Sequence, residues 1–246
     1  MCAYIFRIVA ALTAPLSDET SKSLEEHWTS DTEWHLVPLS SGLQRLVVRI
    51  SARGFLGPDV CGDTAWIETT LNYLQMGVRT AFVLQVFPRF LFPLQRWFPL
   101  CRKARKHIDT AGDIIRPIIN RRRLEGKSEQ DAITWFDEAA AGEKYDPVLS
   151  QLSLSWASTH TTADTVTKVI THLAERPSVI QDLREEVIVA VKKNNGLTKS
   201  ALSQMHLLDS ILKESQRLEP LASATLNRVT IEDVTLSNGL WIPKNI

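Results

Sequence analysis

The chain has 246 residues, of which 44% are hydrophobic and 23% are charged, and these proportions are ordinary for a globular protein. Lysine plus arginine equals aspartate plus glutamate at 28 each, so the formal net charge is zero and there is no electrostatic argument for nucleic-acid binding. Glycine and proline are modest and there is no low-complexity tract, which argues against wholesale disorder.

Two apolar stretches near the N-terminal half could be taken for membrane segments. Residues 1–12 carry Arg7 and fall short of the roughly 20 apolar residues of a span; a signal peptide is the alternative, although no basic region or cleavage site stands out. Residues 80–100 are interrupted by Arg89, Arg96 and several prolines. We expect a helix end, a proline-rich connection and a helix start there. A surface that dips into a membrane interface is the functional alternative.

The first clear helical pattern covers residues 39–55, and Gly57-Pro58 should end it. Asp63 is the expected N-cap of a helix that runs toward Val86.

A further helix is predicted over residues 100–123, where isoleucines recur among many basic residues. Pro117 should kink this helix or mark local strain. Arg121, Arg122 and Arg123 close it, and we expect them to form a solvated helix end rather than a nucleic-acid patch.

The rest of the chain continues as helices and then changes character. Capping residues and apolar spacing predict helices over 131–141, 147–175, 177–194, 198–202 and 205–218. After Pro220, β-type residues flank Asn238-Gly239, which is a strong hairpin signal. The predicted fold is therefore mainly α with a small C-terminal β-hairpin.

Two helical segments could carry chemistry. Glu214 and Arg217 lie one turn apart, and taken alone they are an ordinary surface pair. The long helix contains the run Ser-Trp-Ala-Ser-Thr-His-Thr-Thr over residues 155–162. Its hydroxyls could simply bond back to carbonyls of the same helix. Its histidine, His160, could instead shuttle protons near neutral pH.

Together with residues 207–213 and 228–244, these segments resemble the oxygen-activation helix, the Glu-x-x-Arg helix and the following hairpin of the cytochrome P-450 (haem-thiolate monooxygenase) family, of the fungal secondary-metabolism type. The resemblance runs from about residue 12 to the C-terminus. It implies a single partial cytochrome P-450 domain, with a helical slab over about 12–219 and a β-hairpin over about 225–243.

The resemblance assigns roles to individual residues. Thr161 falls at the position of the threonine that helps deliver protons to dioxygen, His160 replaces the usual acid, and Ala157 lies on the haem side. Glu214 and Arg217 correspond to a buried salt-bridge network that supports the haem core, in which the loss of one partner costs about 3–5 kcal/mol in general.

A third candidate follows the Glu-x-x-Arg helix. The resemblance places Arg228 against a haem propionate, a contact that suits a guanidinium. An ordinary hairpin arginine remains the alternative.

The three cysteines, Cys2, Cys61 and Cys101, form neither a disulfide framework nor a zinc pattern. The segment around Cys61 imitates the haem-ligand loop of the family, but its spacing is wrong by one residue and it precedes both helical motifs. We therefore expect free, structural thiols and no metal ligand, so that the electron push of an axial thiolate has no source.

The resemblance also implies a cofactor and partners. These are haem, a hydrophobic small-molecule substrate, an electron-donating reductase and the endoplasmic reticulum membrane surface, with membrane contact through about residues 80–100 and no nucleic acid. The family's anchor and cysteine loop do not occur in the sequence, so we expect a chain truncated at both ends, cytoplasmic if unanchored and inactive by itself. The alternatives are an inactive remnant or a non-catalytic helical binding protein; an unrelated helical enzyme has no second catalytic group at useful spacing.

Overall fold

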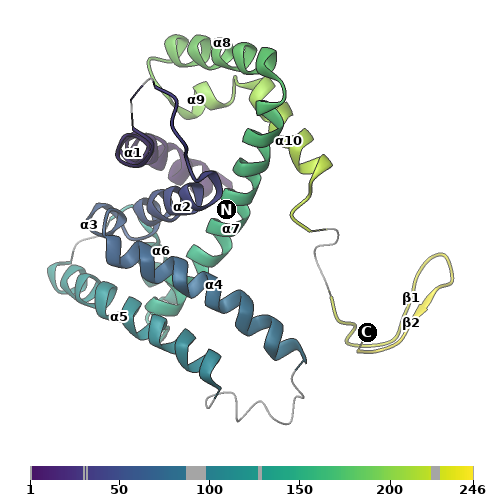
Figure 1. Cartoon of the computed structure of the whole chain (residues 1–246). Coiled ribbons are helices and arrows are strands. Elements are labelled where there is room, and N and C mark those ends of the chain that lie inside the picture. The colour runs from purple at the N-terminus through teal and green to yellow at the C-terminus, as the bar shows by residue number, and fades with distance from the viewer. Residues whose placement is uncertain are drawn as a thin grey trace.

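The computed structural model describes residues 2–29, 31, 33–86, 98–126, 129–222 and 228–245, with side chains throughout those ranges except at 2–10, 81, 85 and 86. Helices dominate these residues and a two-stranded sheet lies near the C-terminus (Figure 1), as the sequence predicts. The helices are α1 (Cys2–Trp28), α2 (Leu39–Phe55), α3 (Pro58–Cys61), α4 (Thr64–Val86), α5 (Pro99–Glu125), α6 (Ala132–Ala140), α7 (Pro147–Ala174), α8 (Pro177–Lys193), α9 (Lys199–Leu202) and α10 (His206–Leu218). The strands are β1 (Val234–Thr235) and β2 (Trp241–Ile242).

Several helices begin where a polar side chain accepts a hydrogen bond from a backbone amide of the first turn. These capping residues are Asp63, Asp131, Asp146 and Thr198. The cap satisfies amides that have no partner within the helix, and so it places the helix start. The predicted starts of α4, α6, α7 and α9 are confirmed to within one residue.

No separate helix was predicted at the position of α1, although the resemblance placed its residues from 12 onward in the helical slab; Pro15 lies inside this helix. Two ionic contacts join α1 to α2: Arg49 donates to Glu19 and to Glu26, and the Arg49 and Glu19 side chains are buried. Helix α5 runs without a break through Pro117 and ends at Gly126, whose φ of 63° is the left-handed conformation of a helix C-cap.

The basic end of α5 differs from the solvated end that the sequence suggested. Arg121 and Arg123 form ion pairs with Asp59 and Asp137. Arg122 is only 5% exposed; it donates to Asp131 and, at 2.9 Å, to the carbonyl of Leu56. The expectation was wrong for Arg122, because two distant segments fold over it.

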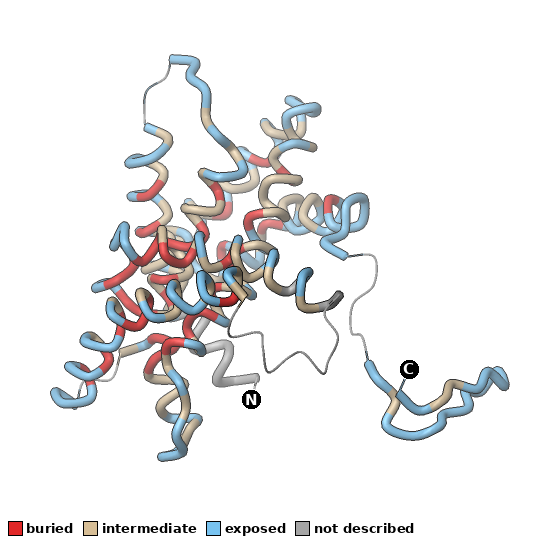
Figure 2. Tube along the Cα trace, turned by 60° about the horizontal axis from the view of Figure 1, so that its bottom comes forward, coloured by how far each residue is buried: buried red, intermediate tan, exposed pale blue. Residues whose placement is uncertain are grey.

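The core is centred on α2 and α7, which pack along each other over much of their length. The largest cluster joins α2, α3, α4, α5, α6 and α7; its buried members are Ala52, Leu56, Val60, Cys61, Trp66, Ala111, Ile115, Ile119, Ile133, Val148 and Leu152. Helices α4 and α5 lie side by side on one flank of α7, and α8 lies at its C-terminal end (Figure 1). Figure 2 shows the buried residues gathered along the inner faces of these helices.

The hairpin predicted around Asn238-Gly239 is present. Strands β1 and β2 are antiparallel with Val234 opposite Ile242, and Gly239 adopts a φ of 83° in the turn. The hairpin stands apart from the helices in Figures 1 and 2, and Trp241 is 58% exposed.

For residues 80–100 the sequence suggested a helix end, a proline-rich connection and a helix start, with membrane contact as the alternative; residues 87–97 lie outside the described residues. Phe82 and Val83, at the end of α4, are 66% and 46% exposed. Within the described ranges, each helix falls short of the length or the apolar content that a bilayer span requires.

Candidate functional site

In helix α7, the segment 155–162 has one buried face and one exposed face. Asp146 caps the helix by accepting from the amides of Val148 and Leu149 at 2.9 and 3.3 Å, and Pro147 occupies the first position. Half-way along, Thr159 and Ala163 are buried, whereas Ala157 and Thr161 are exposed. The helical period of 3.6 residues accounts for the division, because residues four apart share a face.

The exposed side of this segment borders a hollow between α2 and α7. The hollow has a volume of about 560 Å³ and most of its walls are polar. Its lining residues are Ser40, Gln44, His160, Thr161, Ala163, Asp164, Thr167, Lys168 and Leu221. We call it the α2–α7 hollow. It brings together His160 and Thr161, two of the residues that the sequence singled out.

His160 is half-buried at the wall of this hollow. Its Nε2 atom is buried and has no hydrogen-bond partner among the described residues. The imidazole stands edge-on to the ring of Trp156, with centroids 6.3 Å apart and planes at 80°. A buried polar atom without a partner is costly, and Nε2 is closed off from solvent in this orientation of the ring.

Thr161 makes the local contact that the conservative interpretation anticipated. Its hydroxyl donates to the carbonyl of Ala157 at 2.8 Å, one turn earlier. The hydroxyl oxygen keeps acceptor capacity. Sequence reasoning did not single out Thr159, which is fully buried and whose hydroxyl has no partner in the described part of the chain.

Asp164 is a site residue that the sequence interpretation missed. It lies one turn after His160, lines the same hollow and forms a 2.7 Å ion pair with Lys168. Lys168 also donates to the carbonyl of Glu219 at 3.4 Å, just after α10. The signal was available in the sequence, since residues four apart on a helix are neighbours. An acid is therefore present in the hollow although His160 holds the position where one was expected.

Glu214 and Arg217 pair with each other on α10, but they are not buried. Arg217 donates from Nε and Nη2 to the two carboxylate oxygens at 2.7 and 2.6 Å. The side chains are 67% and 55% exposed for Arg217 and Glu214, respectively. The hydrogen bonds from Arg217 lower the pKa of Glu214. The buried network implied by the resemblance is thus not formed among the described residues.

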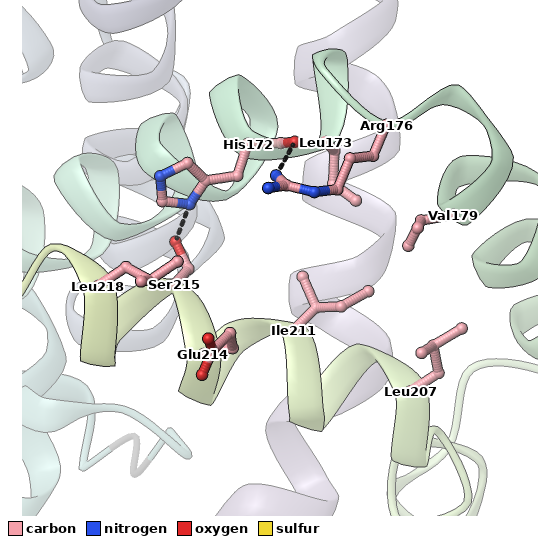
Figure 3. A pocket seen from close by; sticks show the side chains of 9 residues that line it. All are labelled: His172, Leu173, Arg176, Val179, Leu207, Ile211, Glu214, Ser215 and Leu218. Atoms are coloured by element: carbon pink, nitrogen blue, oxygen red, sulfur yellow. Dashed lines mark hydrogen bonds between the residues drawn. The ribbon is translucent and has the colours of Figure 1, made fainter.

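A groove of about 370 Å³ separates the end of α7 from α8 and α10 (Figure 3). Apolar residues such as Val179, Leu207 and Ile211 line it. At one side the imidazole of His172 lies 3.1 Å from Ser215 Oγ and 3.3 Å from a Glu219 carboxylate oxygen. These contacts fasten α10 to α7.

The described cysteines lie in packed surroundings. The Cys61 thiol donates to the carbonyl of Pro58 at 3.6 Å, and burial raises its pKa. Cys101 is also buried. Neither lines the α2–α7 hollow, and the described residues contain no group of three or more histidine, cysteine, aspartate or glutamate side chains that could hold a metal ion.

Arg228 follows residues 223–227, which lie outside the described part of the chain. It is exposed and belongs to the segment that leads into the hairpin. Arg228 is not among the residues that line the α2–α7 hollow.

Comparison with known proteins gives consistent matches. Residues 35–246 match the family model for cytochrome P450. The cytochrome P450 monooxygenase phqO of Penicillium fellutanum is 75% identical over 197 residues, which are 80% of this chain and 45% of that protein. The cytochrome P450 monooxygenase cle4 of Aspergillus versicolor is 43% identical over 246 residues, which are 97% of this chain and 49% of that protein.

A solved structure supports the fold. Retinoic acid bound cyanobacterial CYP120A1 superposes with a TM-score of 0.71 at 21% identity, over 97% of this chain and 51% of that one. At this identity the likeness concerns the fold alone. The chain spans about half the length of the curated relatives it matches.

Proposed function

Because the chain belongs to the cytochrome P450 family, we propose that it supplies the oxygen-side helix of a haem-dependent monooxygenase that oxidises a hydrophobic small molecule in fungal secondary metabolism. The observation that carries the proposal is the α2–α7 hollow. It gathers His160, Thr161 and Asp164 on one wall, and such a set of groups can hold and transfer protons.

Each residue of the wall has a distinct task in this proposal. His160 exchanges a proton through its imidazole, which lies at the wall of the hollow. The Thr161 hydroxyl, anchored on Ala157, accepts a hydrogen bond in the hollow. Asp164 forms an ion pair with Lys168 at the same wall. Ala157, one turn before Thr161 and not among the lining residues, contributes a small exposed side chain to α7.

The cofactor of the family is haem, which supplies the oxidising chemistry when bound. The described cysteines do not fit the axial position, because Cys61 and Cys101 are packed in the core away from the hollow. We propose that Glu214, Arg217 and Arg228 take up haem-supporting roles only when further protein covers α10 and the hairpin. Their present exposure is consistent with such a covering.

Partners and location follow from the family. Cytochromes P450 generally act on a substrate with electrons from a reductase. We propose that this protein acts at the endoplasmic reticulum membrane surface and contacts the membrane near the end of α4, where Phe82 and Val83 are exposed.

The domain assignment is part of the same proposal: one partial cytochrome P450 domain, with its helical slab over 12–219 and its hairpin over 225–243.

A second candidate is a non-catalytic helical binding protein. The burial of Cys61 and Cys101 favours it for the chain acting alone, because no described thiol is free to ligate iron. The groove beside His172 and the α2–α7 hollow would then be its binding surfaces.

A spectrum of the haem-supplemented protein, reduced under carbon monoxide, separates the two candidates. The chain alone is expected to give no red-shifted Soret band of thiolate type. The same chain, extended at its C-terminus with the residues that follow the matched region of cle4, is expected to give that band.

The unmodified cle4 protein is the control for the extension. If cle4 gives the band and the extended chain does not, the monooxygenase proposal fails. A thiolate band from the chain alone would instead overturn the conclusion about its cysteines.

A further inference from the structure

The orientation of His160 depends on one neighbour. No described residue forms a hydrogen bond with its buried Nε2, so no hydrogen bond at that atom fixes the ring. Its ring meets that of Trp156, one turn earlier on α7, at a centroid distance of 6.3 Å and an interplanar angle of 80°. This edge-on geometry is a preferred arrangement for aromatic rings, and it restrains the imidazole about its side-chain torsions.

Trp156 is itself held by another helix. Tyr73 of α4 meets its indole edge-on at 6.2 Å and 73°. Gly77, one turn further along α4, lies so close that a Cβ added there would come within 1.9 Å of the indole Cζ3. The indole also packs against a buried cluster made by Val48, Ile67 and Leu74. The position of the indole is therefore set by α4 and α2, not by α7 alone.

We propose that Trp156 is the positioning residue for His160. The indole fixes the imidazole against the wall of the α2–α7 hollow and decides which ring nitrogen is presented to it. Through the ring contacts Tyr73–Trp156 and Trp156–His160, the position of α4 then affects the orientation of the proton-exchanging imidazole. This inference rests on the proposed role of His160 and adds the residue that orients it.

The glycine at position 77 is what makes these two ring contacts feasible. Any larger side chain there would collide with the indole, and a Cβ contact of this kind forces one of the two groups to move. A movement of the indole would change its contacts with Tyr73 and with His160. A substitution at residue 77 of α4 should therefore change the orientation of the His160 ring indirectly, through Trp156.

The test uses the chain itself, without haem. Proton NMR of the imidazole ring reports the ring current of a nearby indole, and diethyl pyrocarbonate followed by peptide mass analysis reports how fast His160 reacts. Trp156→Leu is expected to move the His160 ring resonances toward their unfolded values and to raise the reaction rate several-fold. Trp156→Phe keeps an aromatic edge and is expected to restore most of the protection.

Met205→Ala is the control for stability, because Met205 is 4% exposed in a separate cluster with Ala190 and Ala201. It should lower the urea midpoint and leave the His160 resonances in place. If Met205→Ala shifts them as Trp156→Leu does, Trp156 acts only through stability and the proposal is wrong. Unchanged His160 signals in Trp156→Leu would also overturn it.

Two variants on α4 test the transmission. Gly77→Ala is expected to shift the His160 resonances from a distance; if it does not fold, Tyr73→Leu gives the same test with a milder change. An unchanged His160 in a folded variant would refute the role of α4. Because no haem is needed, these results are independent of the carbon monoxide spectrum, and the two proposals can fail separately.

Discussion

Replacing the buried Arg122 should be one of the costliest single substitutions for the stability of this protein. Its side chain is 6% exposed and that of its partner Asp131 is 2% exposed. Arg122→Met would leave the carboxylate buried with the Thr134 amide as its remaining described donor and would deprive the Leu56 carbonyl of its donor. Removing one partner of such a pair costs about 3–5 kcal/mol. With a urea slope of about 1–3 kcal/mol/M, the midpoint should fall by at least about 1 M.

Urea unfolding followed by circular dichroism measures this cost, and Arg121→Met is the matched control. Arg121 is the neighbouring residue and its side chain is 55% exposed in its pair with Asp59, so the same substitution should cost no more than about 1 kcal/mol. Arg122→Met combined with Asp131→Asn removes both charges and keeps an N-cap residue, so it should recover much of the loss. Equal shifts for the two methionine variants, or a double variant as unstable as the sum of the singles, would refute the reasoning.

Three further outcomes follow from exposure and charge. Because burial raises the pKa of Cys61, iodoacetamide should alkylate this thiol far more slowly in the folded chain than in guanidinium chloride, and equal rates would contradict its burial. Hydrogen bonds from Arg123 hold the pKa of Asp137 below its ordinary 3.8, so the stabilisation is complete above that pH and is lost as the pH falls through the lower folded value. Asp137→Asn should therefore lower the free energy of unfolding at about pH 7 by no more than about 1 kcal/mol, because the pair is partly exposed, and by much less at about pH 3. Urea unfolding measures both values, and an equal loss at the two pH values would be inconsistent with this reasoning. Glu214→Gln should leave the urea midpoint of this chain unchanged, because Glu214 and Arg217 are exposed, and a clear drop would mean that the pair is covered in solution.

The helix boundaries were readable from the sequence because they depend on short-range chemistry. Asp131 and Asp146 cap helices with their own side chains, and the Asn238-Gly239 turn needs only a glycine that tolerates positive φ. Helix α1 was not predicted as a separate element from its own residues, whereas α5 was predicted although it also contains an internal proline, Pro117. In the structure α1 packs against α2, and this contact includes the buried Arg49–Glu19 pair.

The α2–α7 hollow was only half visible in the sequence. The run from Ser155 to Thr162 pointed to one wall, and the i to i+4 relation would have added Asp164. The contributions of Ser40 and Gln44 could not be foreseen, because they come from a helix more than a hundred positions away in the chain. The support of His160 by Trp156 and α4 was hidden for the same reason.

The sequence by itself determined most of the helical segments, where those begin, and to which family the chain is similar, because caps, turns and motif residues act within a few positions of one another. Only the tertiary structure decided the environment of each charged group. The basic run at the end of α5 holds a buried arginine because Leu56 and Asp131 fold over Arg122, whereas the Glu214–Arg217 pair is exposed because no described segment covers that face of α10. Burial depends on neighbours that come from other segments of the chain. It decides whether breaking an ion pair costs much stability or very little.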